Sequence, residues 1–277
     1  MRPSIADKRA TFRQLHDSGC FVIPNPWDVG SAIMLQSLGF KAIASTSAGM
    51  AWAMGRPDTG VNRGDVLAHL AQLVTAVDLP VNADYENGFA DAPEGVAESV
   101  RLAAEAGVAG LSIEDSTGDR DAPLYDFGLA VERIAAARAA IDAAGGGVLL
   151  TGRSEGFIAG RPDLEETIRR LRAYSEAGAD CLYAPGIRDE AQITAVVQAV
   201  APKPVNVLSF GMPVAKLAEL GVRRISVGGS LARAAYGEFL RAARQIAGEG
   251  SFEAFGRAAP GAELNGFFAE RREPRSG

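Results

Sequence analysis

The sequence predicts an α/β protein of the (β/α)8 or TIM-barrel class, with one domain over residues 1–277 and extra helices at its C-terminal end. Eight short apolar runs alternate with helical stretches rich in Ala, Leu, Glu and Arg. A helix end, a glycine and a strand start recur at three places, Glu105-Ala-Gly, Glu176-Ala-Gly and Glu219-Leu-Gly, which indicates one repeated unit. Eight consecutive units of this kind close naturally into a barrel.

The apolar runs are short enough to be strands that are buried on both faces of a parallel sheet. We expect them at Cys20–Pro24, Ala42–Ser45, Val81–Asp84, Gly110–Glu114, Val148–Thr151, Cys181–Ala184, Val205–Leu208 and Arg224–Val227. A doubly wound open sheet is the alternative. It has no use for eight consecutive short strands, and no Gly-x-Gly-x-x-Gly follows the first run.

Helices are expected between the strands, and a glycine that tolerates the left-handed cap follows several of them. The expected helices are Ser31–Leu38, Arg63–Ala76, Pro93–Ala106, Leu129–Ala143, Leu164–Ala177, Glu190–Ala199 and Pro213–Leu220.

The C-terminal region, residues 248–277, is expected to be a helical extension. It follows a long helix at Ser230–Ala247 and contains amphipathic segments at Ser251–Ala258 and Ala262–Arg271. Phenylalanines in these segments need burial, either across the bottom of the barrel or by exchange with a neighbouring subunit. We therefore expect a homo-oligomer, a dimer or tetramer in which C-terminal helices can be exchanged. We expect Arg271–Gly277 to be disordered.

The composition excludes several classes of function. Hydrophobic residues make up 47% and charged residues 22%, which supplies a large core and argues against disorder. The net charge of −6 leaves no basic footprint for nucleic acid. No run approaches the ~20 apolar residues of a membrane helix, and the N-terminus lacks an apolar signal core. We expect a soluble cytoplasmic protein that binds neither nucleic acid nor membrane.

Charged residues end three consecutive expected strands. Asp84 and Glu86 end the third, Glu114 ends the fourth and Arg153 follows the fifth. The carboxyl ends of parallel strands meet at one rim, where α/β enzymes keep their active sites. Ionised groups at such a place cost desolvation energy unless they hold a metal or a charged ligand.

The acids at this rim predict a metal site. Residues 84 and 86 would face the same side of an extended strand, and Glu114 ends the neighbouring strand. Oxygen ligands of this kind suit Mg²⁺, with Mn²⁺ as the alternative. Asp58 adds a further acid. Helix capping or pairing with arginine is the competing interpretation of these carboxylates.

Arg153 is expected to bind a carboxylate or phosphate group of the substrate through its planar fork. A structural ion pair with Glu155 or Glu114 is the alternative. The segment Ser45-Thr-Ser-Ala-Gly49 can cradle an anionic oxygen with its amides, or it can be a simple tight turn.

Several motifs in this order resemble those of the isocitrate lyase/phosphoenolpyruvate mutase superfamily, from about residue 10 to residue 245. They are Asn25-Pro-Trp-Asp28, Ser45-Thr-Ser-Ala-Gly49, Gly55-Arg-Pro-Asp58, Asp84-x-Glu86, Ile113-Glu-Asp115, Gly152-Arg153 and Pro204-Val-Asn206. The resemblance implies a Mg²⁺-dependent (β/α)8 barrel that cleaves or forms a C–C or P–C bond beside a 2-oxo acid or its enolate.

The resemblance also implies roles for individual residues. Asp84 would be the direct metal ligand, and Glu86 and Glu114 would reach the metal directly or through water. Asp58 would lie beside the reacting centre. Arg153 would grip the oxo-acid end of the substrate. The remaining substrate-binding residues would be Trp27, Thr46, Ser47, Ala48 and Asn206.

Two departures from the superfamily pattern matter for function. Lyases carry a Lys-Lys-Cys-Gly-His loop whose Cys donates a proton, whereas residues 116–125 contain no Cys, Lys or His. Ala184-Pro185-Gly186 stands where the lyases have Pro-Glu. Proton delivery would then fall to water or to a loop residue, Tyr125 or Ser116. We therefore expect no isocitrate or methylisocitrate lyase.

The expected activity is that of a Mg²⁺-dependent C–C lyase or decarboxylase. Its substrate would be a small 2-oxo acid or 2-oxo dicarboxylic acid, cleaved through a metal-stabilised enolate. Phosphonopyruvate hydrolysis or phosphoenolpyruvate mutation is the alternative chemistry. A 2-oxo-acid-binding protein without turnover is the alternative class, because the loop residues are missing.

Overall fold

The computed structural model describes residues 2–209 and 211–270, and the expected disorder of Arg271–Gly277 therefore concerns residues outside the described part. The chain divides into two compact units, Met1–Leu231 and Ala232–Gly277, and the single domain over residues 1–277 stays a prediction. No described helix combines the length and the apolar character that crossing a membrane requires.

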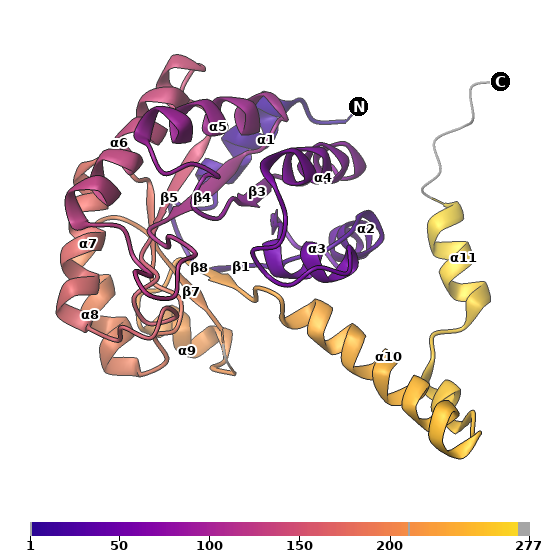
Figure 1. The fold of residues 1–277 in the computed structure, drawn as a ribbon. Helices are drawn as coiled ribbons and strands as arrows, with labels where there is room; N and C mark the ends of the chain where they lie inside the picture. Colours follow the sequence, from indigo (N-terminus) through magenta and orange to yellow (C-terminus); the bar gives the residue numbers. More distant parts are fainter. Residues whose placement is uncertain (1, 210, 271–277) are drawn as a thin grey trace. The chain divides into compact units, whose positions relative to one another are not determined.

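The first unit is built on eight parallel strands in the order β1-β8-β7-β6-β5-β4-β3-β2. The ends of the sheet also meet, because the amide of Ala44 donates to the carbonyl of Pro24 at 3.0 Å. The predicted (β/α)8 barrel is confirmed (Figure 1). The strands are β1 (Phe21–Ile23), β2 (Ile43–Ala44), β3 (Val81–Asp84), β4 (Gly110–Glu114), β5 (Leu149–Arg153), β6 (Cys181–Tyr183), β7 (Val205–Leu208) and β8 (Arg224–Ser226).

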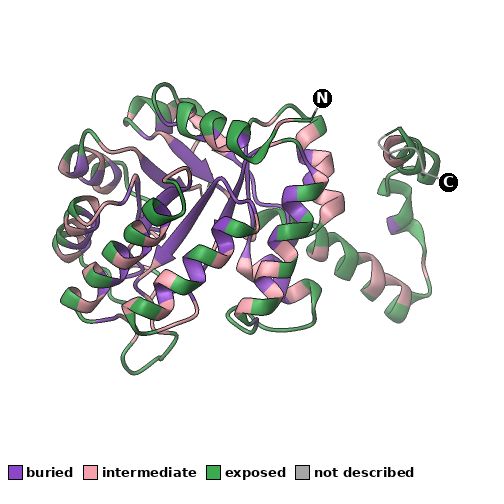
Figure 2. Cartoon of the chain, turned by 90° about the horizontal axis from the view of Figure 1, so that it is seen from above, coloured by how far each residue is buried: buried purple, intermediate pink, exposed green. Residues whose placement is uncertain are grey.

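Helices surround the strands and turn their buried faces toward them, as the colouring by burial shows (Figure 2). The seven helices that were expected between strands are present. They are α2 (Val29–Ser37), α4 (Arg63–Ala76), α5 (Pro93–Glu105), α6 (Phe127–Ala143), α7 (Leu164–Glu176), α8 (Glu190–Val200) and α9 (Val214–Glu219). α4 has the expected bounds, and the other six differ at one or both ends by one or two residues. Side-chain caps fix several starts; Asp163, for example, accepts from the amide of Glu166 at 3.0 Å.

Two further helices were not expected from the sequence. α1 (Ile5–Gln14) begins with a capping box between Ser4 and Asp7. α3 (Ser47–Ala53) begins inside the segment that was expected to be a turn, and the hydroxyl of Thr46 caps it by accepting from the amide of Gly49 at 3.2 Å. The turn interpretation of residues 45–49 is therefore wrong beyond Thr46.

The interior of the barrel changes from apolar to charged along the strands. Alternate residues of a strand share one face, so β5 contributes Leu149, Thr151 and Arg153 to the interior in that order. Leu149 packs in an apolar cluster with Phe12 of α1 and with Ile23. α1 therefore closes the amino-terminal end of the barrel, and the charged residues lie at the carboxyl-terminal end.

The second unit contains most of α10 (Ser230–Glu249), a 3-10 helix η1 (Glu253–Arg257) and α11 (Gly261–Ala269). Phe239, Phe252 and Phe255 are 64%, 61% and 54% exposed. The expectation that such side chains become buried between subunits stays a prediction.

Candidate active site

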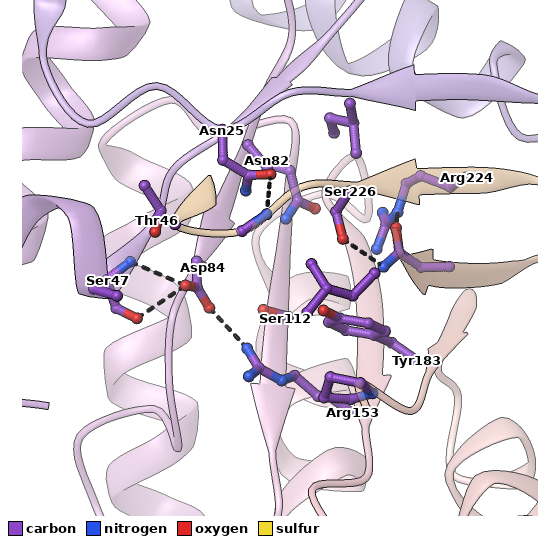
Figure 3. A pocket seen from close by; sticks show the side chains of 18 of the residues that line it. Asn25, Thr46, Ser47, Asn82, Asp84, Ser112, Arg153, Tyr183, Arg224 and Ser226 are labelled. Carbon is purple, nitrogen blue, oxygen red and sulfur yellow. Dashed lines mark hydrogen bonds and ion pairs between the residues drawn. The ribbon is translucent and has the colours of Figure 1, made fainter. Parts of the chain in front are cut away.

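A cavity of about 220 Å³ opens at the carboxyl-terminal end of the strands. Figure 3 shows the side chains that converge on it from the strands and from the loops that follow them. Its wall includes seven of the residues that were expected to act in the site: Thr46, Ser47, Ala48, Asp58, Asp84, Arg153 and Asn206.

Arg153 is surrounded by carboxylates. Its Nη1 lies 3.0 Å from Asp84 Oδ1 and 3.2 Å from Glu114 Oε2, and its Nε donates to Glu155 Oε1 at 2.5 Å. Burial alone would lower the pKa of Arg153, but the charges of Glu114, Glu155 and Asp84 raise that pKa well above its ordinary value. Both the ligand-binding and the ion-pair interpretations of Arg153 thus have support, because the ion-paired guanidinium also faces the cavity.

Asp84 is held in place by the start of α3. The amide and the hydroxyl of Ser47 donate to Asp84 Oδ2 at 3.0 and 2.9 Å (Figure 3). The amide of Asp84 donates to Ser45 Oγ at 2.9 Å. The donors of Ser47 that were expected to hold the substrate carboxylate therefore hold Asp84 in this structure. The role of Thr46, Ser47 and Ala48 toward a substrate stays a prediction.

Glu86 reaches the site differently from the way that was expected. β3 ends at Asp84, and Glu86 has φ +47°, so the two residues are not alternate members of one extended strand. The left-handed backbone is sparsely populated by residues other than glycine and indicates local strain. The prediction that residues 84 and 86 share one face of an extended strand is therefore wrong. The charge of Asp84 nevertheless contributes to raising the pKa of Glu86.

The acids around Asp84 carry more negative charge than Arg153 compensates. Burial, followed by the charges of Asp84 and Asp58, raises the pKa of Glu86 to about 7. Burial and the charge of Asp84 likewise raise the pKa of Asp58. In addition, Glu86 Oε1 is buried without a hydrogen-bond partner. A cation beside these oxygens would relieve the repulsion and satisfy the buried oxygen.

These observations fit a divalent cation held by Asp84 and Glu86. Among the residues that the structure describes, no three His, Cys, Asp or Glu side chains already stand in the arrangement of a metal site. The carboxylates of Asp84 and Glu114 are turned to Arg153 instead. Metal binding by Asp84, Glu86 and Glu114 therefore requires side-chain rearrangement and stays a prediction.

Four of the expected site residues are not part of the cavity wall: Glu86, Glu114, Tyr125 and Trp27. The hydroxyl of Tyr125 donates to Asp91 Oδ1 at 2.5 Å and accepts from Asn87 Nδ2 at 3.2 Å. Trp27 lines a separate cavity together with His69. The structure does not bring either side chain to the wall beside Arg153.

Several polar residues of the cavity wall were not predicted from the sequence. They are Asn25, Asn82, Ser112, Tyr183, Arg224 and Ser226. Tyr183 is buried, its ring lies 5.2 Å from the guanidinium carbon of Arg153, and burial raises its pKa to about 12. The signal that could have found most of them is a polar residue inside an apolar strand run, at positions that alternate with core residues.

Comparisons with known proteins agree with this arrangement. A family model described as phosphoenolpyruvate phosphomutase matches residues 12–247. An uncharacterised protein of Mycobacterium tuberculosis is 35% identical over 79% of this chain and 81% of its own length. An oxaloacetate decarboxylase of Pseudomonas paraeruginosa is 31% identical over 80% of this chain and 79% of its own length.

Solved structures give the same result. A crystal structure from Burkholderia cenocepacia, described as a lyase or mutase, is 51% identical, covers 96% of both chains and has a TM-score of 0.91. A phosphonopyruvate hydrolase in complex with oxalate and Mg²⁺ is 26% identical, covers 95% of this chain and 96% of its own, and has a TM-score of 0.83. The chain therefore belongs to the phosphoenolpyruvate phosphomutase family, within the isocitrate lyase/phosphoenolpyruvate mutase superfamily that its strand-end motifs resemble.

Proposed function

We propose that this chain is a Mg²⁺-dependent C–C lyase or decarboxylase that acts on a small 2-oxo acid. The observation that carries the proposal is the cluster of Asp84, Glu114 and Glu155 around Arg153, at the mouth of a polar cavity. The oxaloacetate decarboxylase relative and the Mg²⁺–oxalate complex of the phosphonopyruvate hydrolase support the same chemistry.

Asp84 and Glu86 would hold the metal, with Glu114 reaching it directly or through water. When bound, Mg²⁺ would supply positive charge to the oxo and carboxylate oxygens of the substrate as negative charge develops there. Arg153 would orient the acid by donating from its planar fork. Asp58, which also lines the cavity, would face the reacting bond. Asn206 would contact the far side of the substrate.

Tyr183 is a better candidate for the proton donor than Tyr125, because Tyr183 lines the cavity and Tyr125 does not. Its raised pKa keeps the phenol protonated at neutral pH. Replacing Tyr183 by Phe would then slow protonation of the product and leave substrate binding nearly unchanged.

Pyruvate release tests the proposed function. The protein with Mg²⁺ is incubated in turn with oxaloacetate, 2-methylisocitrate and phosphonopyruvate, and the same reactions with EDTA are the controls. We expect oxaloacetate to exceed 2-methylisocitrate by about 10² or more in rate, because the loop lacks a matched general acid. Faster pyruvate release from phosphonopyruvate than from oxaloacetate would indicate that the enzyme cleaves a P–C bond rather than a C–C bond. Binding of these acids without any turnover would identify a 2-oxo-acid-binding protein.

We also propose that copies of the chain associate through the second unit. The exposed side chains Phe239, Phe252 and Phe255 support this, because large apolar side chains are seldom left together in water. Light scattering on the wild type and on a Phe239→Ser, Phe252→Ser variant should show a dimer or tetramer that dissociates in the variant. A monomeric wild type would reject the proposal.

A further inference from the structure

A second arginine forms the floor of the active-site cavity. Arg224 is the first residue of β8, is 3% exposed, and lines the cavity with Asn206 and Ser226 (Figure 3). It points into the barrel because its register partners on the neighbouring strands, Phe21 and Asn206, belong to the interior layers. The proposed function does not use this residue.

The charge of Arg224 is met only by neutral groups. Its Nε donates to Asn206 Oδ1 at 2.8 Å, its Nη2 donates to Thr151 Oγ1 at 2.9 Å, and its Nη1 lies 3.3 Å from His16 Nε2. No carboxylate among the described residues forms an ion pair with it. A buried ionised group without a counter-charge is costly, so such a group indicates an anion that is bound in use.

Other buried cations of the molecule have partners that explain them. Arg153 and Arg170 lie beside carboxylates. Arg133 donates to the backbone carbonyls of residues 87, 90 and 91 in the loop before α5, and Lys8 donates to those of residues 74 and 77 at the end of α4. Arg224 differs because its three partners are side chains and because it faces a cavity.

The two cavity arginines lie one interior layer apart. Arg224 Nη2 bonds to Thr151, and Thr151 precedes Arg153 by two residues on β5. Two residues advance a parallel strand by about 6.6 Å. A short carbon chain with an acidic group at each end can therefore contact Arg153 at the mouth and Arg224 at the floor. The other polar side chains of the lower wall, Asn82, Ser112 and Ser226, are neutral and do not repel such a group.

We propose that Arg224 forms an anion subsite that binds the second carboxylate of a small dicarboxylic 2-oxo acid whose oxo-acid end lies at Arg153. This inference rests on the proposed function and specifies its substrate class. A monocarboxylic acid leaves Arg224 without an anionic partner. The site should therefore bind the dicarboxylate about 10-fold to 100-fold more tightly, the range typical of one hydrogen-bonded charge pair.

Calorimetric titration at saturating Mg²⁺ tests the subsite with two ligands. Pyruvate has only the oxo-acid end, and 3,3-difluorooxaloacetate adds the second carboxylate. Arg224→Gln should weaken the affinity for 3,3-difluorooxaloacetate by about 10-fold to 100-fold and should change the affinity for pyruvate by less than about twofold. Arg223→Gln is the matched control, because Arg223 precedes it and its Nη1 bonds to the carbonyl of Gly19 outside the cavity. That control should change neither affinity.

Equal losses for the two ligands in Arg224→Gln, or no loss for the dicarboxylate, would overturn the subsite. If the Gln variant does not fold, Arg224→Lys keeps the charge without the planar fork and should lower the preference for the dicarboxylate only in part. An unchanged preference in Arg224→Lys would also count against the subsite. Succinate separates the two proposals: Arg224-dependent binding of succinate by a protein that ignores pyruvate would retain the subsite and reject the proposed function.

Discussion

The two ends of the barrel interior are built from the same eight strands but carry opposite chemistry. At the amino-terminal end, Phe12 of α1 packs with Leu149 in an apolar cluster. At the carboxyl-terminal end, Arg153 is paired with three carboxylates and lines a cavity together with one of them, Asp84. One β5 strand joins both ends, from Leu149 to Arg153. We therefore expect the closed end to stabilise the fold, and the open end, where charges repel, is where we propose that binding and chemistry take place.

The largest expected effect is a loss of folding stability when the apolar packing at the closed end is disrupted. Phe12→Ala removes a fully buried ring and should lower the free energy of unfolding by about 3 to 5 kcal/mol, which corresponds to about 6 to 20 °C in the melting temperature. Below the melting temperature the turnover should be unchanged, because the ring lies away from the cavity. Leu38→Ala, at a 74% exposed side chain, is the control and should have a small effect. Similar melting temperatures for the two variants would contradict this division.

The second prediction concerns Mg²⁺ binding and turnover at the open end. Asp84→Ala removes the proposed metal ligand, so Mg²⁺ binding should be lost by calorimetry and turnover should fall by about 10² to 10³. The melting temperature should hold, because fewer acids then repel one another around Arg153. Asp78→Ala, at an exposed acid paired with Arg2, is the control. Unchanged Mg²⁺ affinity in Asp84→Ala would reject Asp84 as a ligand.

The third prediction concerns the pH dependence of folding stability, which His16 at the closed end should cause. His16 is buried against Phe12, and burial together with the charge of Arg224 lowers its pKa from 6.5 to about 3. The folded state therefore binds a proton less readily than the unfolded state. The folded state is therefore favoured while His16 is neutral. The free energy of unfolding has its full value above pH 6.5 and decreases as the pH falls toward 3, by up to about 1.4 kcal/mol per pH unit.

Urea unfolding between pH 7.5 and 5 measures this effect. The wild type should lose about 2 kcal/mol more than His16→Gln, which cannot titrate. Parallel curves for the two proteins would mean that His16 does not sense pH.

The smallest effect concerns the geometry of the charged end. Arg153→Lys keeps the charge but loses the planar fork that bonds to Asp84 and Glu155, so affinity for a 2-oxo dicarboxylate should fall by about 10-fold or more. Arg101→Lys, on an exposed helix face, should have no effect. An unchanged affinity in Arg153→Lys would make Arg153 a structural residue.

The order of strands and helices, the barrel class and the rim on which Asp84, Glu114 and Arg153 meet could all be predicted from the sequence. Local patterns carry that information, because alternation, glycine caps and strand-end charges are set by neighbours in the chain. The same patterns did not reveal α1, since its role is to cover a surface that exists only after the barrel closes.

Only the tertiary structure decided which side chains share the cavity. Tyr125 and Trp27 follow strands, yet they lie elsewhere, because loop and helix packing turns them to Asp91 and to the separate cavity beside His69. Arg224 looked like an ordinary strand residue. Its position below Arg153 depends on the register of β5 to β8, and strand register is a relation between segments far apart in the chain.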